Sequence, residues 1–244
     1  MEKNVGNNCK KIVGLRLMDD PLFAAALAGS PEAAEVVLQI LLEDPKLRVV
    51  KVIVQAPDTE LYSQGVRVGV YAIDGKYRCV NAEMLYADSG LEPKRARYVC
   101  ALADAEHAPT EDDIEDLPET YIITLCGEDP LGKGMPLYIA QTEIHETHQP
   151  LDDGRHFVYV NTTYTGDDNY GNLFMDLRAN NPDKMHFHTL AKATALAWET
   201  VCKESGKRPQ CSTVSRREIL LKTRAISYLL KEAHVSLEAA RKFV

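Results

Sequence analysis

The chain has 244 residues, of which 45% are hydrophobic and 26% are charged, and its formal net charge is −8 at pH 7. This length fits one large domain, or one domain with a small appendage. The negative charge argues against broad, non-specific affinity for nucleic acid, although a local basic patch can still bind phosphate. We expect no membrane span, because no apolar run approaches the roughly 20 residues that a bilayer requires.

Cysteine usage and the first residues bear on the compartment. The six cysteines are scattered and lack C-x-x-C spacing, which is typical of reduced thiols. The opening string MEKNVGNNCKK has no apolar region of the kind that a secretory signal needs. We therefore expect a cytoplasmic protein that begins with a flexible tail over residues 1–15.

Two helices and a strand are predicted after this tail. Asp20 suits the N-cap of the first helix and Pro21 suits its first turn. Ser30 and the Pro-Glu pair that follows it start a second helix, which carries an apolar stripe. Residues 47–54 form a largely continuous apolar run, which indicates a buried strand.

A β-hairpin over residues 66–85 is the most informative stretch of the chain. Apolar residues alternate in its first half, with the period of two that indicates a half-buried strand. The pair Asp74-Gly75 is a strong turn signal. The second half places Val80, Ala82 and Met84 on one face and Cys79, Asn81 and Glu83 on the other.

The loop length decides which residues of the hairpin face each other. A two-residue loop would place Gly69 on the face opposite Glu83. A three-residue loop, with Gly75 at positive φ, pairs Arg67 with Glu83 and Gly69 with Asn81. We prefer the longer loop, because it gathers the valines on one apolar face and leaves Glu83 with the polar residues and the gap at Gly69.

The next helix, predicted over residues 94–105, begins with basic residues. Lys94, Arg95 and Arg97 lie in or next to its first turn, where cations oppose the helix dipole. A phosphate, or an ion pair with Glu83, would relieve that conflict. We expect Tyr98 to face the core. The later chain is predicted to add strands over 121–125, 136–140 and 156–161, a helix over 189–203, and two C-terminal helices over 216–228 and 237–243.

These strings, in this order, resemble the PD-(D/E)XK nuclease superfamily, and within it the recombination-promoting nuclease branch often labelled nuclease family transposase. The matching strings are R-V-G-V-Y-A at 67–72, D-G at 74–75, E-M-L at 83–85 and P-K-R-A-R-Y at 93–98. The resemblance covers roughly residues 17–205. It implies an α/β (α+β) restriction-endonuclease-like fold with a mixed sheet of about five strands flanked by helices, assigned here to residues 16–205. A helical extension over residues 206–244 follows.

The resemblance also implies Mg²⁺- or Mn²⁺-dependent hydrolysis of DNA in recombination or mobile elements. Glu83 would be the catalytic and metal-binding residue, and Lys94, Arg95 and Arg97 would bind the DNA. Two groups of the family pattern are missing. Gly69 stands at the position of the metal-binding aspartate, and Leu85 stands at the position of the glutamine or lysine. We therefore expect weak cleavage or none.

Other carboxylates could replace the missing aspartate. Asp20 and Asp58 are the candidates, with Asp19, Glu32 and Glu60 as further ones. For those near helix starts we prefer helix capping and interaction with the helix dipole as the explanation, and Glu83 itself could pair with Arg67, Lys94 or Arg95 as a plain salt bridge.

Three further patterns have simpler interpretations. The acidic run at 111–116 indicates a solvated loop or helix end. The G-x-x-x-x-G-K spacing at 127–133 lacks the following Ser or Thr and the following helix, so we interpret it as a hairpin turn. The histidines of H-E-T-H at 145–148 and H-F-H at 186–188 are expected at the surface.

An alternative function remains open from the sequence. The chain could be a non-catalytic scaffold that binds DNA, forms a homodimer, pairs with an active paralogue, or serves as an antitoxin-like subunit. A third alternative is a structural interaction protein with no role in DNA binding.

Overall fold

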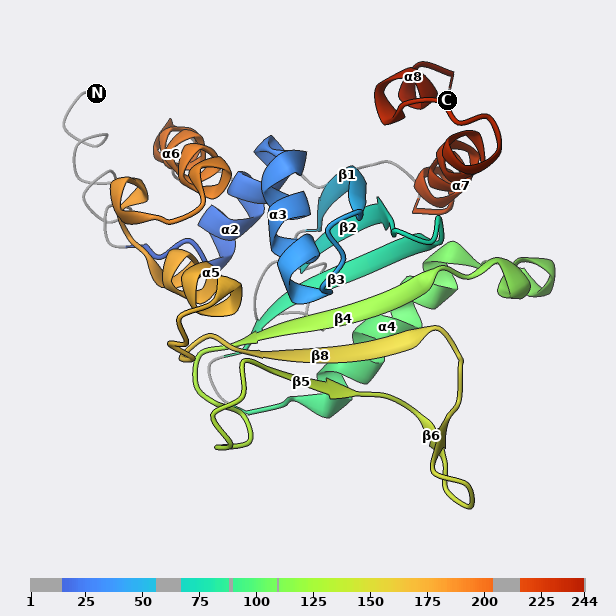
Figure 1. Cartoon of the computed structure of the whole chain (residues 1–244), viewed down its shortest axis with the longest axis horizontal. Coiled ribbons are helices and arrows are strands. Elements are labelled where there is room, and N and C mark those ends of the chain that lie inside the picture. The colour runs from blue at the N-terminus through green and yellow to red at the C-terminus, as the bar shows by residue number, and fades with distance from the viewer. Residues whose placement is uncertain (1–14, 56–66, 88–89, 109, 204–215, 244) are drawn as a thin grey trace.

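The computed structural model describes residues 15–55, 67–87, 90–108, 110–203 and 216–243. The fold is α/β, with a mixed six-stranded sheet flanked by helices (Figure 1). The expected fold class is confirmed, with one strand more than expected. The strand order is β1-β2-β3-β4-β8-β5, and β6 and β7 form a separate ribbon. The strands are β1 (Arg48–Gln55), β2 (Arg67–Ile73), β3 (Cys79–Ala87), β4 (Glu119–Cys126), β5 (Leu137–Ala140), β6 (Glu143–Ile144), β7 (Gln149–Pro150) and β8 (Arg155–Asn161).

The sheet combines an antiparallel meander with parallel strands. Strand β2 pairs antiparallel with both β1 and β3, whereas β3 pairs in parallel with β4, and β4 in parallel with β8. A parallel connection needs a crossover, and helix α4 (Pro93–His107) provides it between β3 and β4. Strand β5 pairs antiparallel with β8 at the sheet edge.

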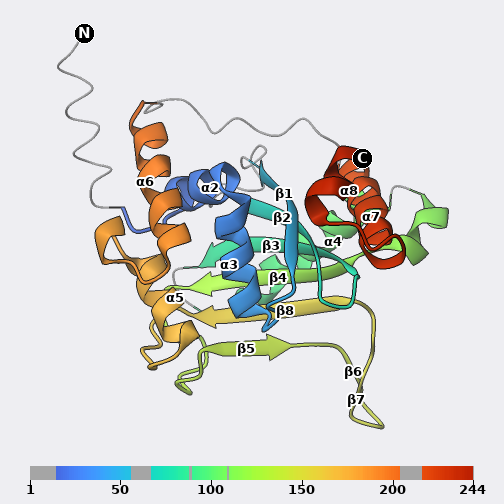
Figure 2. The same cartoon turned by 45° about the horizontal axis from the view of Figure 1, so that its top comes forward.

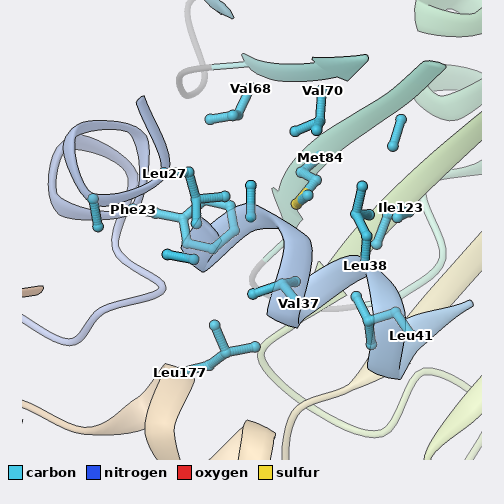
Figure 3. Packing of buried hydrophobic residues seen from close by; sticks show 14 of the residues in the cluster. Phe23, Leu27, Val37, Leu38, Leu41, Val68, Val70, Met84, Ile123 and Leu177 are labelled. Carbon is cyan, nitrogen blue, oxygen red and sulfur yellow. The ribbon is translucent and has the colours of Figure 1, made fainter. Parts of the chain in front are cut away.

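The main core lies on one face of the sheet. Helices α2 (Asp20–Gly29), α3 (Pro31–Leu41), α5 (Asn169–Arg178) and α6 (His188–Lys203) cover this face (Figure 2). Figure 3 shows the valines of the hairpin pointing at the apolar stripe of α3. Each fully buried side chain of this size contributes about 1.5–3 kcal/mol. The core residues shown with labels are Phe23, Leu27, Val37, Leu38, Leu41, Val68, Val70, Met84, Ile123 and Leu177.

The helix starts follow the sequence closely. Ser30 caps α3, because its side-chain oxygen accepts a hydrogen bond from the backbone N–H of Ala33 at 3.3 Å. Helix α2 begins one residue earlier than predicted, with Asp19 at the N-cap. The carboxylate of Asp19 accepts hydrogen bonds from the backbone and side chain of Arg16 instead of capping the helix. Helix α5 and the β6–β7 ribbon were not predicted.

The opposite face of the sheet carries α4 and the C-terminal helices. Helices α7 (Arg216–Glu232) and α8 (Leu237–Phe243) confirm the two helices predicted there, with α7 longer by one turn. They lie beside α4 and away from α6 (Figure 2). Helix α4 packs with Ala96, Val99 and Cys100 inward. The prediction that Tyr98 faces the core is wrong, since Tyr98 is 43% exposed and lies outside this buried stripe.

No single helix in the described ranges combines the length and the apolar composition that a bilayer span requires.

Candidate functional site

The hairpin register brings Glu83 directly opposite Gly69. The structure pairs Gly69 with Glu83 and Tyr71 with Asn81, so the predicted pairing of Gly69 with Asn81 and of Arg67 with Glu83 is wrong. The shift is by two residues, which keeps every side chain on its predicted face. Glu83, Asn81 and Gly69 still share the polar face of the hairpin.

A longer loop causes this shift. The Asp74 carboxylate accepts hydrogen bonds from the backbone N–H groups of Lys76 and Arg78, at 2.9 and 2.7 Å, and so closes the turn. Tyr77, rather than Gly75, adopts the left-handed conformation, with φ of 64°. Gly75 instead lies against Asp44, whose carboxylate accepts the Gly75 N–H at 2.6 Å.

The Glu83 side chain is fully buried and paired with a C-terminal arginine. Arg216, the first residue of α7, donates from both terminal nitrogens of its guanidinium to the two Glu83 oxygens, the second bond measuring 3.3 Å. The Arg216 side chain is itself only 3% exposed. Arg67 lies on the other side, with its Nε 3.4 Å from the Glu83 carboxylate.

Gly69 leaves the room that Arg216 fills. A Cβ at this position would lie 3.2 Å from a terminal nitrogen of Arg216 and 3.3 Å from a Glu83 oxygen. It would also lie 3.0 Å from Ile53. The guanidinium therefore occupies the space toward which a residue-69 side chain would point.

A second carboxylate meets the same guanidinium. Glu106, near the end of α4, lies 2.5 Å from the Arg216 Nε and 3.5 Å from Arg67. Two carboxylates and two guanidiniums thus form a neutral network across β2, β3, α4 and α7. We call Glu83, Glu106, Arg67 and Arg216 the ion-pair quartet; Glu83 and Arg216 are buried, whereas the Glu106 side chain is 39% exposed.

Two neutral groups border the ion-pair quartet. The Tyr71 hydroxyl is 2.7 Å from the His107 Nε2, and Arg216 donates to the same hydroxyl at 3.5 Å. Burial and the nearby Arg216 charge lower the pKa of His107 to about 4, so its imidazole is neutral. Burial raises the pKa of Tyr71.

The charge state of Glu83 is fixed by its neighbours. Burial alone would raise the pKa of this carboxyl, but the positive charges of Arg216 and Arg67 outweigh it and hold the pKa below its usual value. Removing one partner of such a buried pair typically costs about 3–5 kcal/mol. Glu83 is therefore held in its ionised form as the ion-pair partner of Arg216 and Arg67.

Leu85, which stands where the resemblance implies a glutamine or lysine, lies in apolar surroundings. Leu85 is buried and packs with Ala96, Val99 and Ile122. A polar amide or ammonium there would lie among apolar groups, so the substitution at 85 matches its packing.

The predicted DNA-binding residues lie elsewhere on α4 and do not contact Glu83. Lys94 and Arg97 are exposed on the first two turns. Arg95 is tied to Glu92 at 2.8 Å and donates to the Tyr86 carbonyl at 2.9 Å. The expected pairing of Glu83 with Lys94 or Arg95 is therefore wrong, and its expected pairing with Arg67 is present beside the closer one with Arg216.

The candidate substitute carboxylates whose side chains the structure describes do not contact the quartet. Asp58, Glu60 and the side chain of Asp20 lie outside the described residues. Asp19 is occupied by Arg16, and Glu32 accepts a hydrogen bond from Ser30 at the surface.

Mg²⁺ does not fit this donor set. It prefers oxygen ligands with room for bound water, whereas the oxygens of Glu83 are buried and face arginine nitrogens. The part of the chain that the structure describes holds no group of three His, Cys, Asp or Glu side chains arranged for a metal.

The remaining sequence patterns have structural roles. In the 127–134 turn, Asp129 accepts the backbone N–H groups of Gly132 and Gly134, at 2.9 and 2.7 Å, so these groups are not offered to a phosphate. The acidic run at 111–116 forms an exposed 3₁₀ turn. His148 lies exposed on the β6–β7 ribbon, and His186 pairs with the buried Asp176 at 2.9 Å.

Sequence reasoning missed Arg216, Glu106, Tyr71 and His107. Arg216 begins the predicted helix over residues 216–228, and no spacing links it to residue 83. The one available signal was the small residue at 69, opposite a carboxylate that needed a partner. No family model, curated protein or solved structure matches the chain.

Proposed function

We propose that this chain is a PD-(D/E)XK nuclease-fold protein of the transposase-related branch that does not cleave DNA and acts as a non-catalytic, DNA-associated partner. The observation that carries the proposal is the buried Glu83 carboxylate, whose two oxygens are taken by Arg216. Because this carboxylate is fully buried and faces arginine nitrogens, its surroundings leave no room for a hydrated metal ion. The α/β fold and the position of Glu83 on the hairpin support the resemblance.

Contact with DNA is proposed for the start of α4. Lys94 and Arg97 are exposed there, and exposed cations at the positive end of a helix dipole favour phosphate as a ligand. Cys100 and Cys126 are free thiols, which agrees with action in the cytoplasm.

Binding is tested by fluorescence anisotropy on a labelled duplex at several salt concentrations. The wild-type protein is expected to bind with a salt-dependent affinity, and Lys94→Glu with Arg97→Glu to reduce the salt slope by about 2. Lys184→Glu with Lys192→Glu is the matched control, because it changes the net charge equally at exposed positions away from α4. Equal losses in both double variants, or no binding at low salt, would refute DNA contact through α4.

Cleavage is tested on supercoiled plasmid with Mg²⁺ or Mn²⁺. The wild-type protein is expected to leave the plasmid intact. Nicking that disappears in Glu83→Ala would overturn the non-catalytic assignment.

A second candidate function is pairing with another subunit, either a second copy or an active paralogue. Strand β5 ends the sheet, and no described strand pairs with its outer side. Ile139 on this strand is 65% exposed, and exposed edge strands readily accept a further strand. Light scattering is expected to give a dimer mass that Ile139→Lys reduces to the monomer mass. A monomer at all concentrations would exclude self-pairing.

A further inference from the structure

Three oxygen-bearing side chains surround the Arg216 guanidinium. Its terminal nitrogens contact both Glu83 oxygens, and its Nε lies 2.5 Å from Glu106. The Tyr71 hydroxyl accepts a further hydrogen bond at 3.5 Å. The two-point contact with Glu83 uses the planar fork of the guanidinium, which is the geometry that distinguishes arginine from lysine, whereas the contact between Nε and Glu106 is an ion pair without hydrogen-bond geometry.

The absence of a side chain at residue 69 completes this setting. The nearest terminal nitrogen of Arg216 would lie 3.2 Å from a Cβ at this position. Any larger side chain would therefore compete with the guanidinium for the same space. The backbone at Gly69 does not have a positive φ, so glycine is needed there for the space that it leaves and not for its backbone conformation.

The segment that brings Arg216 is held mainly by ordinary packing. Ile219 and Leu220 of α7 pack on Ile53 and Tyr71, and Ile226 packs on Ile73. These contacts would place α7 on the sheet without a buried charge. The guanidinium is thus an additional, directional contact at the first residue of the helix.

We propose that the nuclease-fold domain contains a guanidinium-binding pocket, and that α7 carries its tethered ligand, Arg216. This inference rests on the proposed function above, in which Glu83 binds no metal, and it names the group that occupies the Glu83 oxygens. The pocket is formed by Glu83, Glu106, Tyr71 and the bare backbone at Gly69. Its ligand class is a guanidinium group, and a divalent cation is the competing occupant.

Chemical rescue tests the pocket. Arg216→Ala is expected to lower the melting temperature by about 10 °C. Methylguanidinium at about 20 mM is expected to raise it again by about 4–6 °C, as for a ligand with a Kd near 1 mM. Sodium chloride at equal ionic strength should not. Arg224→Ala is the matched control, because Arg224 is on the same helix and makes an exposed pair with Asp116, and it should show no rescue.

Each other outcome of this experiment overturns the proposal. Stabilisation of Arg216→Ala by Mn²⁺ but not by methylguanidinium would make the centre a masked metal site. Stabilisation by neither would leave no pocket. These results require no DNA, so they are independent of the test of DNA binding.

A second variant covers the case in which Arg216→Ala does not fold. Arg216→Lys keeps the charge but not the planar fork, and a guanidinium pocket predicts a fall of at least about 5 °C in its melting temperature. The corresponding Arg224→Lys change should have little effect. Equal stability of Arg216→Lys and the wild-type protein would overturn the proposal.

Discussion

Glu83 and Arg216 are 133 positions apart in the chain, and their side chains form a buried two-point ion pair opposite Gly69. The pair joins the hairpin to the C-terminal helix. It also accounts for the two observations that the sequence left separate, a carboxylate retained at 83 and no side chain at 69. Filling the gap with a guanidinium gives the carboxylate a partner without a metal.

Introducing the aspartate and glutamine that the proposed family would carry is expected to be insufficient for cleavage. In Gly69→Asp with Leu85→Gln, the new carboxylate would point at the Arg216 nitrogen that lies 3.2 Å from the Cβ position. It would therefore join the ion pairs and leave the Mn²⁺-dependent nicking of supercoiled plasmid absent. The same double variant with Arg216→Ala is the comparison. Nicking by the double variant with Arg216 in place would contradict this account.

Acid is expected to destabilise the fold through His107. Its pKa falls from an ordinary 6.5 to about 4, mainly because of burial. The unfolded state therefore binds more protons between about pH 6.5 and pH 4, and stability falls as the pH falls through that window, by up to about 3 kcal/mol.

Urea unfolding at a series of pH values measures this effect. His107→Gln should flatten the slope between pH 6.5 and pH 4.5. The exposed His148→Gln should keep the wild-type slope. Equal slopes in the two variants would assign the acid sensitivity to other groups.

The hairpin loop gives a stability prediction that is independent of the quartet. A Cβ on Gly75 would lie 2.9 Å from an Asp44 oxygen, so Gly75→Ala should strain the bond between Gly75 N–H and Asp44 and cost about 1–2 kcal/mol. Gly29→Ala is the control, because nothing lies within 4 Å of its Cβ position. Denaturant unfolding that gives equal free energies for the two variants would refute this role of Gly75.

Local signals predicted much of the fold. Ser30 before Pro31 located α3 to the residue, because a cap depends only on near neighbours. The alternation of valines placed the correct face of β2 and β3 on the core, because a strand has a fixed period of two.

Contacts between residues far apart in the chain determine the features that the sequence did not predict. The hairpin loop contacts Asp44, whose carboxylate accepts the Gly75 N–H from 31 positions away. The partner of Glu83 depended on how α7 packs. Arg216 and Arg217 look alike in the sequence, and only the docked helix makes the first of them a buried residue.

The most direct test of the account is a double-mutant cycle on Glu83→Gln and Arg216→Gln, with unfolding free energies measured in urea. A buried two-point pair predicts that each single variant is strongly destabilised, and that the two changes couple by about 2–3 kcal/mol. The control cycle on Asp116→Asn and Arg224→Gln, an exposed pair, should couple by less than about 1 kcal/mol. Effects at Glu83 and Arg216 that add within about 0.5 kcal/mol would contradict the claim that Arg216 holds Glu83 in a buried ion pair.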